Sequence, residues 1–419
     1  MSTAIKVRAI TTLSSTIEFY DFALFLFLAP VISQHFFPDA SHLGSIMPAL
    51  LVYFAGYLAR FVGGLFYSHF GDVYGRKNSY MYSIIIISMA TFAIALLPGY
   101  ETWGVAAPVL LLLLRIIQGL SIGGEVPGAL TFAAEHSQPG QRGMVTGLII
   151  AGLTLGTAFA SGAMSGLYFV LGDENVRQWG WRLAFLLGAI MGAISLWLRF
   201  SLSETPAYQQ LKNEMDKTRV PLKRLVHDHK MALVKGISIA TVPALCFSVL
   251  FFLPRLQGHY LHTPMSDAFS LSSLSLFMLT LLALFTGYLS DKVGRVPMIK
   301  GGALIVLIFF PTGIHFLLQG NLPGVFVLSP LLLGVAALNG TYEAAIVELF
   351  PTHTRYSGVA FCHNASFGII AGLNPLLLEW FCRQGLFYLM GVIPALFALW
   401  LLCLSVRWQE RNKASLESF

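Results

Sequence analysis

The chain has 419 residues, of which 56% are hydrophobic and only 11% are charged. Soluble globular domains carry about 25% charged residues, so this composition excludes an ordinary water-soluble fold. The four cysteines lie in or beside apolar runs and lack the spacing of metal ligands or of a disulfide framework. We therefore expect an integral membrane protein without a structural metal or disulfides.

Twelve apolar runs are each long enough to cross a bilayer, which takes about 20 helical residues. In chain order they cover 11–37, 44–68, 79–98, 105–133, 143–171, 181–200, 231–254, 267–290, 298–318, 324–349, 357–381 and 386–406. The first run holds Glu18 and Asp21 and is longer than the core of a signal peptide, so we expect it to remain as the first helix. The predicted fold is an all-α membrane protein with 12 transmembrane helices.

Lys and Arg are unevenly distributed between the two sides of these runs. The side that carries both termini would hold 20 of the 26, the other side four, and Arg60 and Arg115 lie inside runs. By the positive-inside rule both termini are cytoplasmic, and the net charge of +6 needs no nucleic-acid partner. The longest polar segment, 201–230, is predicted to be a cytoplasmic linker between halves 1–200 and 231–419.

Two charged patterns recur in corresponding loops of the two halves. They are Asp72 with Arg76, repeated 219 residues later as Asp291 with Arg295, and Glu135 with Arg142, repeated 213 residues later as Glu348 with Arg355. Nearly equal offsets predict duplicated six-helix halves, an architecture of secondary transporters. We expect these residues to form ion pairs that hold one conformation and break in another.

Several motifs extend this interpretation to a family. They are Glu18-Phe19-Tyr20-Asp21, the Arg60 to Lys77 stretch, Arg115 to Glu125 (RIIQGLSIGGE), Trp179-Gly180-Trp181-Arg182, Glu204 to Tyr208 (ETPAY) and Phe350 to Ser357 (FPTHTRYS). Over nearly the whole chain they resemble the metabolite:proton symporters of the major facilitator superfamily, which include proline/betaine, citrate, α-ketoglutarate and shikimate permeases. The resemblance implies the major facilitator fold, and the compact loops favour a bacterial inner (plasma) membrane. Glu343, His363 and the short segment after the last run depart from the family pattern, which leaves the substrate and osmotic regulation open.

Ionisable residues within the apolar runs are the candidate site. Burying each costs about 2.5–3.5 kcal/mol on insertion scales, so such residues usually face the interior and serve a function. Counting 1.5 Å per residue places Glu18 about 10 Å and Asp21 about 15 Å deep, on one helix face. Together with Arg60, Arg115 and Glu125 they predict a cluster of three acids and two arginines in the first half. Such a cluster either holds the half together as ion pairs or exchanges a proton.

Roles for these residues follow from the resemblance and from chemistry. By resemblance, Asp21 and Glu125, with Glu18 after them, are expected to couple protons. Arg115 is expected to grip a substrate carboxylate because a guanidinium binds it through two hydrogen bonds, whereas Arg60 is expected to be structural. Further substrate-binding candidates are Tyr20, Asn339, Tyr342, Glu343, His363 and Asn364. Glu343 could instead form a contact in a gate or transfer a proton. His363 could instead serve in packing or in a hydrogen bond to the backbone.

The sequence thus predicts a proton-coupled importer of a small organic acid or zwitterion of the amino acid or betaine class. The alternative is a proton-coupled exporter or antiporter, including one for a larger polycarboxylate such as a siderophore. A non-transporting sensor on the same scaffold is a third possibility. The chain has no ATP-binding or catalytic motif, so neither an enzyme nor a cofactor is expected. Its expected partners are the small molecule, the proton and the lipid bilayer, with the chain acting as a monomer.

Overall fold

The computed structural model describes residues 3–38, 45–74, 76–135, 137–138, 140–200, 225, 227–320, 324–406 and 408–410, with the side chains of 3–11, 67–81, 198–200 and 352–353 left out. The described part of the chain is helical and contains no strand. The first half consists of α1 Thr3–Phe27, α2 Ala29–Phe36, α4 Met47–Tyr74, α5 Arg76–Leu96, α6 Tyr100–Trp103, α7 Ala106–Ile122, α8 Glu125–Glu135, α9 Arg142–Asn175, the π-helical turn η1 Val176–Gly180 and α10 Trp181–Phe200. The second half consists of α13 Lys230–Arg255, η2 Leu256–Tyr260, α14 Met265–Val293, α15 Arg295–Gln319, α16 Gly324–Asn339, α17 Tyr342–Val347, α18 Thr352–His363, η3 Asn364–Ile370, α19 Ala371–Arg383 and α20 Leu389–Ser405.

These helices account for the 12 predicted spans. Among the described residues, eight helical segments are long and apolar enough to cross a membrane, and a bent pair of helices makes a ninth. One of the eight, Arg142–Trp197, has 56 residues, more than two crossings require, and contains both α9 and α10. Two shorter apolar helices, Tyr82–Leu96 and Leu389–Ser405, supply the remaining spans.

The first span is not the continuous helix that its sequence predicted. Thr12–Phe27 and Ala29–Phe36 meet at an angle of 61°. Pro30 lies in the first turn of α2, where its missing N–H is tolerated, whereas in a continuous helix the same proline would remove a hydrogen bond and clash with the preceding turn. The bend therefore follows from Pro30.

Glycines bring α4 and α7 into backbone contact. A Cβ added at Gly119 would lie 2.0 Å from the carbonyl oxygen of Gly56, and one at Gly123 would lie 2.1 Å from that of Arg60. Small residues at a crossing allow the backbones of two membrane helices to approach this closely. The contact fixes the two helices that carry Arg60 and Arg115.

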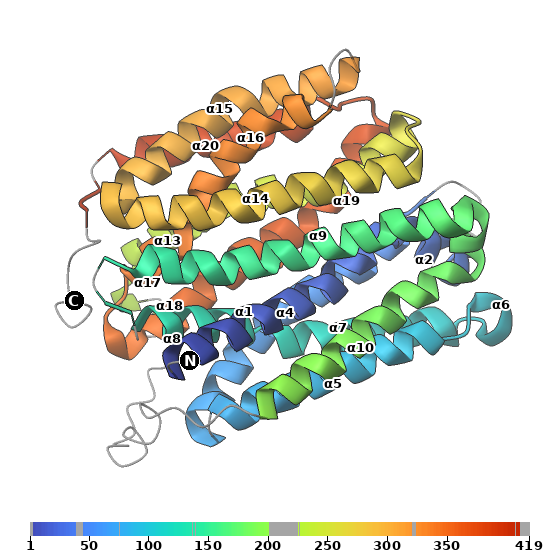
Figure 1. Cartoon of the computed structure of the whole chain (residues 1–419), viewed down its shortest axis with the longest axis horizontal. Helices are drawn as coiled ribbons and strands as arrows, with labels where there is room; N and C mark the ends of the chain where they lie inside the picture. The colour runs from blue at the N-terminus through green and yellow to red at the C-terminus, as the bar shows by residue number, and fades with distance from the viewer. Residues whose placement is uncertain are drawn as a thin grey trace.

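The two halves lie side by side along α9 and α14, which run next to each other for most of their length (Figure 1). The start of α1 and the end of α20 lie toward the same end of the bundle (Figure 1), which we call the terminal end; the opposite one is the distal end. That the terminal end is cytoplasmic stays a prediction. So do the half boundaries, because 201–224 of the predicted linker lie outside the described residues.

Candidate functional site

Asp21 on α1 is part of a buried polar cluster inside the first half. Its side chain is hydrogen-bonded to the hydroxyl of Thr91 on α5 and accepts a 2.9 Å hydrogen bond from Nε2 of Gln118 on α7. Oε1 of Gln118 in turn accepts a 2.9 Å bond from Nη1 of Arg115. The two charges are therefore joined through one amide, while the Oδ1 atom of Asp21 has no hydrogen-bond partner among the described residues.

Arg115 is fully buried, and only part of its bonding capacity is used. Its guanidinium lies 4.0 Å from the ring centroid of Phe25 and 5.1 Å from that of Phe22. Nε and Nη2 have no hydrogen-bond partner in the described part of the chain. Since buried polar groups are nearly always satisfied, two N–H donors in this state are suited to receive an anionic ligand.

Three other predicted residues of the first half, Glu18, Tyr20 and Glu125, are also buried. Glu125 is buried on α8 and accepts a 3.3 Å hydrogen bond from Ser83, and Glu18 is also buried. The hydroxyl of Tyr20 donates to the backbone oxygen of Ala184 at 3.1 Å and so attaches α1 to α10. The roles predicted for Glu18, Tyr20 and Glu125 stay predictions.

Arg60 reaches across to the second half. Its Nη2 lies 2.8 Å from Nε2 of His363, and its Nε donates to Oδ1 of Asn364 at 3.2 Å. Asn364 in turn donates to the backbone oxygen of Gly123 at 2.9 Å. Nδ1 of His363 is hydrogen-bonded to Glu343. Arg60, His363 and Glu343, which we call the interface triad, are all buried.

Aromatic rings enclose the histidine of this triad. The rings of Tyr342 and Phe367 are nearly parallel to that of His363, at centroid distances of 6.4 and 4.9 Å. The ring of His363 therefore packs between aromatic side chains, which was one of the two alternatives. Its nitrogens contact the charged side chains of Arg60 and Glu343, not the backbone. Asn339 is buried on α16, and its Nδ2 has no hydrogen-bond partner among the described residues.

The repeated acid–arginine pairs meet crosswise at the terminal end. Arg142 of the first half lies 3.3 Å from Glu348 of the second, and Arg355 of the second lies 2.9 Å from Glu135 of the first. Glu348 also contacts Arg295 at 3.2 Å. We call these five residues the terminal gate. In each of the two cross-pairs, the acid belongs to one half and the arginine to the other.

Asp291 adds a contact of a different kind between the halves. Its two carboxylate oxygens accept the backbone N–H groups of Gly143 and Met144, both at 2.8 Å, and it pairs with Arg295 at 2.7 Å. A carboxylate at the first turn of α9 is favoured by the unpaired N–H groups and the helix dipole. The side chains of Asp72 and Arg76, the counterparts in the first half, lie outside the described residues.

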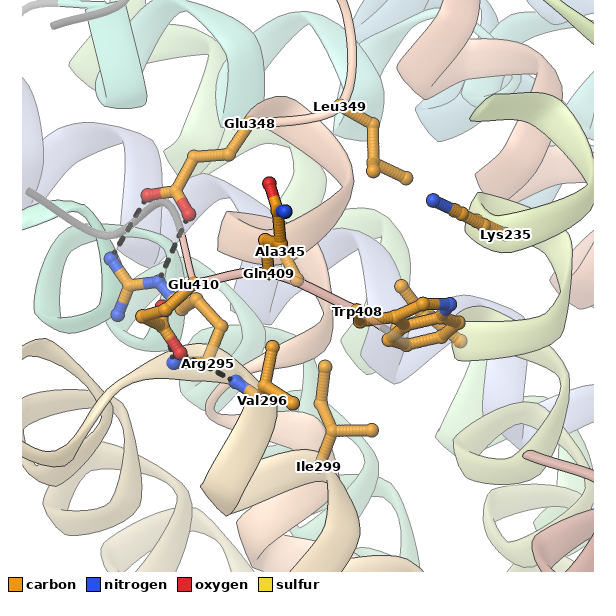
Figure 2. A pocket seen from close by; sticks show the side chains of 11 residues that line it. Lys235, Arg295, Val296, Ile299, Ala345, Glu348, Leu349, Trp408, Gln409 and Glu410 are labelled. Atoms are coloured by element: carbon orange, nitrogen blue, oxygen red, sulfur yellow. Dashed lines mark hydrogen bonds and ion pairs between the residues drawn. The ribbon is translucent and has the colours of Figure 1, made fainter. Parts of the chain in front are cut away.

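A cavity of about 140 Å³ opens beside the gate in the second half (Figure 2). Arg295 and Glu348 form one wall, and Lys235 and Trp408 face it (Figure 2). Glu410 accepts the backbone N–H groups of Arg295 and Val296, both at 2.9 Å. The segment after α20 is thereby attached to the start of α15.

Sequence reasoning missed three buried polar residues. Thr91 and Gln118 join the Asp21 cluster, and the signal for Gln118 was its place three residues after Arg115 in one motif. Glu379 on α19 is fully buried at the distal end, where it pairs with Arg255 at 3.0 Å and Arg383 at 3.2 Å. An acid within an apolar run was the signal for Glu379.

Comparisons with known proteins agree on one family. Residues 7–239 match the family model described as Sugar (and other) transporter, and residues 257–418 match the Major Facilitator Superfamily model. The chain is 33% identical to the Proline/betaine transporter of Salmonella typhimurium, over 89% of this chain and 77% of the relative. It is 29% identical to the inner membrane metabolite transport protein YhjE of Escherichia coli, over 98% of this chain and 95% of the relative.

A solved structure shows the same fold. The proton:xylose symporter XylE bound to 6-bromo-6-deoxy-D-glucose superposes with a TM-score of 0.79, at 17% identity, over 99% of this chain and 98% of that one. The chain is thus a multi-pass bacterial inner-membrane protein and a transporter of small molecules rather than an enzyme. On these grounds, the chain belongs to the major facilitator superfamily of membrane transporters.

Proposed function

We propose that this protein is a proton-coupled importer that takes up a small zwitterion or organic acid as a monomer, by alternating access. Asp21 carries the coupling proton, and Arg115 binds the carboxylate of the substrate. The observation that supports this most is the Asp21–Gln118–Arg115 chain, with hydrogen-bonding atoms at both ends that the described residues leave unused.

The substrate class rests on the surroundings of Arg115. Phe22, Tyr53 and Tyr57 are clustered with centroid separations of 4.5 Å (Phe22–Tyr57) and 4.6 Å (Tyr53–Tyr57), and Phe22 also lies against Arg115. Aromatic faces attract alkylammonium groups, while the guanidinium attracts a carboxylate. A betaine or an amino acid carries both groups, and several relatives are named proline/betaine transporters.

Coupling requires that proton and substrate binding favour each other. A carboxylate that binds Arg115 competes with Asp21 for the positive charge, and protonation of Asp21 removes that competition. Substrate then binds better to the protonated protein, and by linkage the proton binds better when substrate is present. Separation of the terminal gate would release both on the cytoplasmic side.

The test is a pH recording on energy-depleted proteoliposomes that contain the protein, pulsed with amino acids, betaines and carboxylates. We expect one solute to make the outer medium more alkaline and Asp21→Asn to abolish this signal. Asp267→Asn, which changes an exposed acid at the start of α14, is the matched control and should retain the signal. Acidification of the medium would instead favour the exporter or antiporter.

A further inference from the structure

The hydrogen-bond geometry of the interface triad fixes where its protons are. A guanidinium only donates hydrogen bonds, so Nε2 of His363, 2.8 Å from Nη2 of Arg60, must accept. The ring proton then lies on Nδ1, where His363 donates to Glu343. In this conformation His363 is therefore a neutral imidazole between a cation from the first half and an anion of its own half.

We infer that the Glu343–His363 pair is a second proton-binding site and that Arg60 makes its protonation incompatible with the closed contact between the halves. This goes beyond the proposed function and rests on it only in that the two halves separate. It adds a proton site in the second half, where the proposed function places none.

The consequence of one added proton can be followed atom by atom. On Nε2, the proton creates an N–H that faces the N–H of Arg60, so two cationic donors meet in a buried site. On Glu343, the proton removes the negative charge of the triad and leaves the buried guanidinium facing two neutral groups. Because an uncompensated buried charge is strongly unfavourable, either position weakens the Arg60 contact.

The groups around the Glu343–His363 pair supply no second negative charge that could compensate Arg60 once the pair is protonated. The titratable groups that face the pair are Arg60 from α4, Tyr342 from α17 and Cys362 from α18, with Phe367 of η3 stacked on the ring of His363. The remaining oxygen of Glu343, Oε2, has no hydrogen-bond partner among the described residues. It is an available position for a proton that arrives through the space between separated halves.

The location of the triad determines whether protonation favours the closed or the separated arrangement of the two halves. Asn364, next to His363, bonds both Arg60 and the backbone of Gly123, so the triad is part of the closed contact between α4, the junction of α7 and α8, and the second half. Protonation would favour separation of this contact, and separation would allow protonation. One proton would change the ratio of separated to closed molecules by up to tenfold per pH unit, as linkage requires.

The experiment measures this ratio without substrate, so it is independent of whether the proposed transport reaction is right. Spin labels are placed on the full chain at Gln138→Cys and Met231→Cys, exposed positions of the two halves at the terminal end. The exposed Cys403 is replaced by Ser, and the other cysteines are buried. Distances are measured by pulsed electron paramagnetic resonance between pH 8 and pH 5 in an Asp21→Asn background, which removes the first proton site.

We expect acidification to increase the population with the longer distance, and the double variant His363→Gln/Glu343→Gln, which removes both proton positions of the pair, to abolish this response. Glu343→Gln alone should give the longer distance at every pH, and it serves if the double variant does not fold. His315→Gln, on a partly exposed histidine near the distal end, should keep the response of the parent. A parent without a pH response, or an unchanged response in the double variant or in Glu343→Gln, would overturn the inference.

Discussion

Arg142 and Glu348, which belong to different halves, form a buried ion pair with an N–O distance of 3.3 Å, and Arg355 and Glu135 form its mirror at 2.9 Å. The same acid–arginine spacing occurs in both halves, and the two pairs connect the halves in opposite directions. This reciprocity makes the terminal gate a contact that depends on how the halves lie against each other. A transporter that opens at this end must break both pairs together.

Among single substitutions of the acids in the terminal gate, Glu348→Gln should weaken the contact between the halves most. Glu348 contacts both Arg142 and Arg295, and removing one partner of a buried ion pair costs about 3–5 kcal/mol. We expect a lower melting temperature in detergent and faster labelling of a cysteine introduced at Lys235, which lines the neighbouring cavity. The control is Asp173→Asn, from the exposed pair with Arg177, which should change neither quantity; equal effects of both variants would contradict the gate.

Exchange of charge tests the second pair directly. Arg355→Glu should lower the melting temperature, because it places a second acid against Glu135 at the site of a 2.9 Å contact. Adding Glu135→Arg to the same chain should recover much of this loss, since the two charges again attract. A double-mutant cycle with no interaction between the two positions would show that the pair does not hold the halves.

Arg115→Lys should impair substrate binding more than folding. Lysine keeps the charge but cannot offer two parallel N–H donors to a carboxylate. In counterflow exchange, which needs no net proton movement, we expect the KM to rise at least about tenfold, the equivalent of about 1.4 kcal/mol. Arg177→Lys at the exposed distal end is the control, and an unchanged KM in Arg115→Lys would rule out the proposed carboxylate contact.

Gly119→Ala should destabilise the first half. The new Cβ would lie 2.0 Å from the carbonyl oxygen of Gly56, so α4 and α7 must move apart and shift Arg60 and Arg115. Gly301→Ala is the matched control, because nothing lies within 4 Å of a Cβ there, and alanine favours a helix over glycine. Thermal unfolding should show a lower melting temperature for Gly119→Ala and an unchanged one for Gly301→Ala. Similar melting temperatures of the two variants would contradict the close crossing of α4 and α7.

The sequence alone determined the membrane class, the span count and the family, and it predicted an internal repeat. These follow from local quantities: apolar runs long enough to cross a bilayer, and charged motifs at fixed spacing. It also indicated which residues are unusual, because an acid or arginine inside an apolar run stands out without any structure. Asp21, Arg115 and Glu343 were identified in this way, and His363 as a departure from the family pattern.

Only the tertiary structure decided which of these residues meet. Arg60 was expected to belong with the acids of the first half, but it bonds His363 and Asn364, more than 300 positions away. Asp21 and Arg115 are joined through Gln118, an uncharged residue that composition does not single out. The physical reason is that partner choice depends on helix rotation and on the packing of the two halves, and neither is encoded in the spacing within one helix.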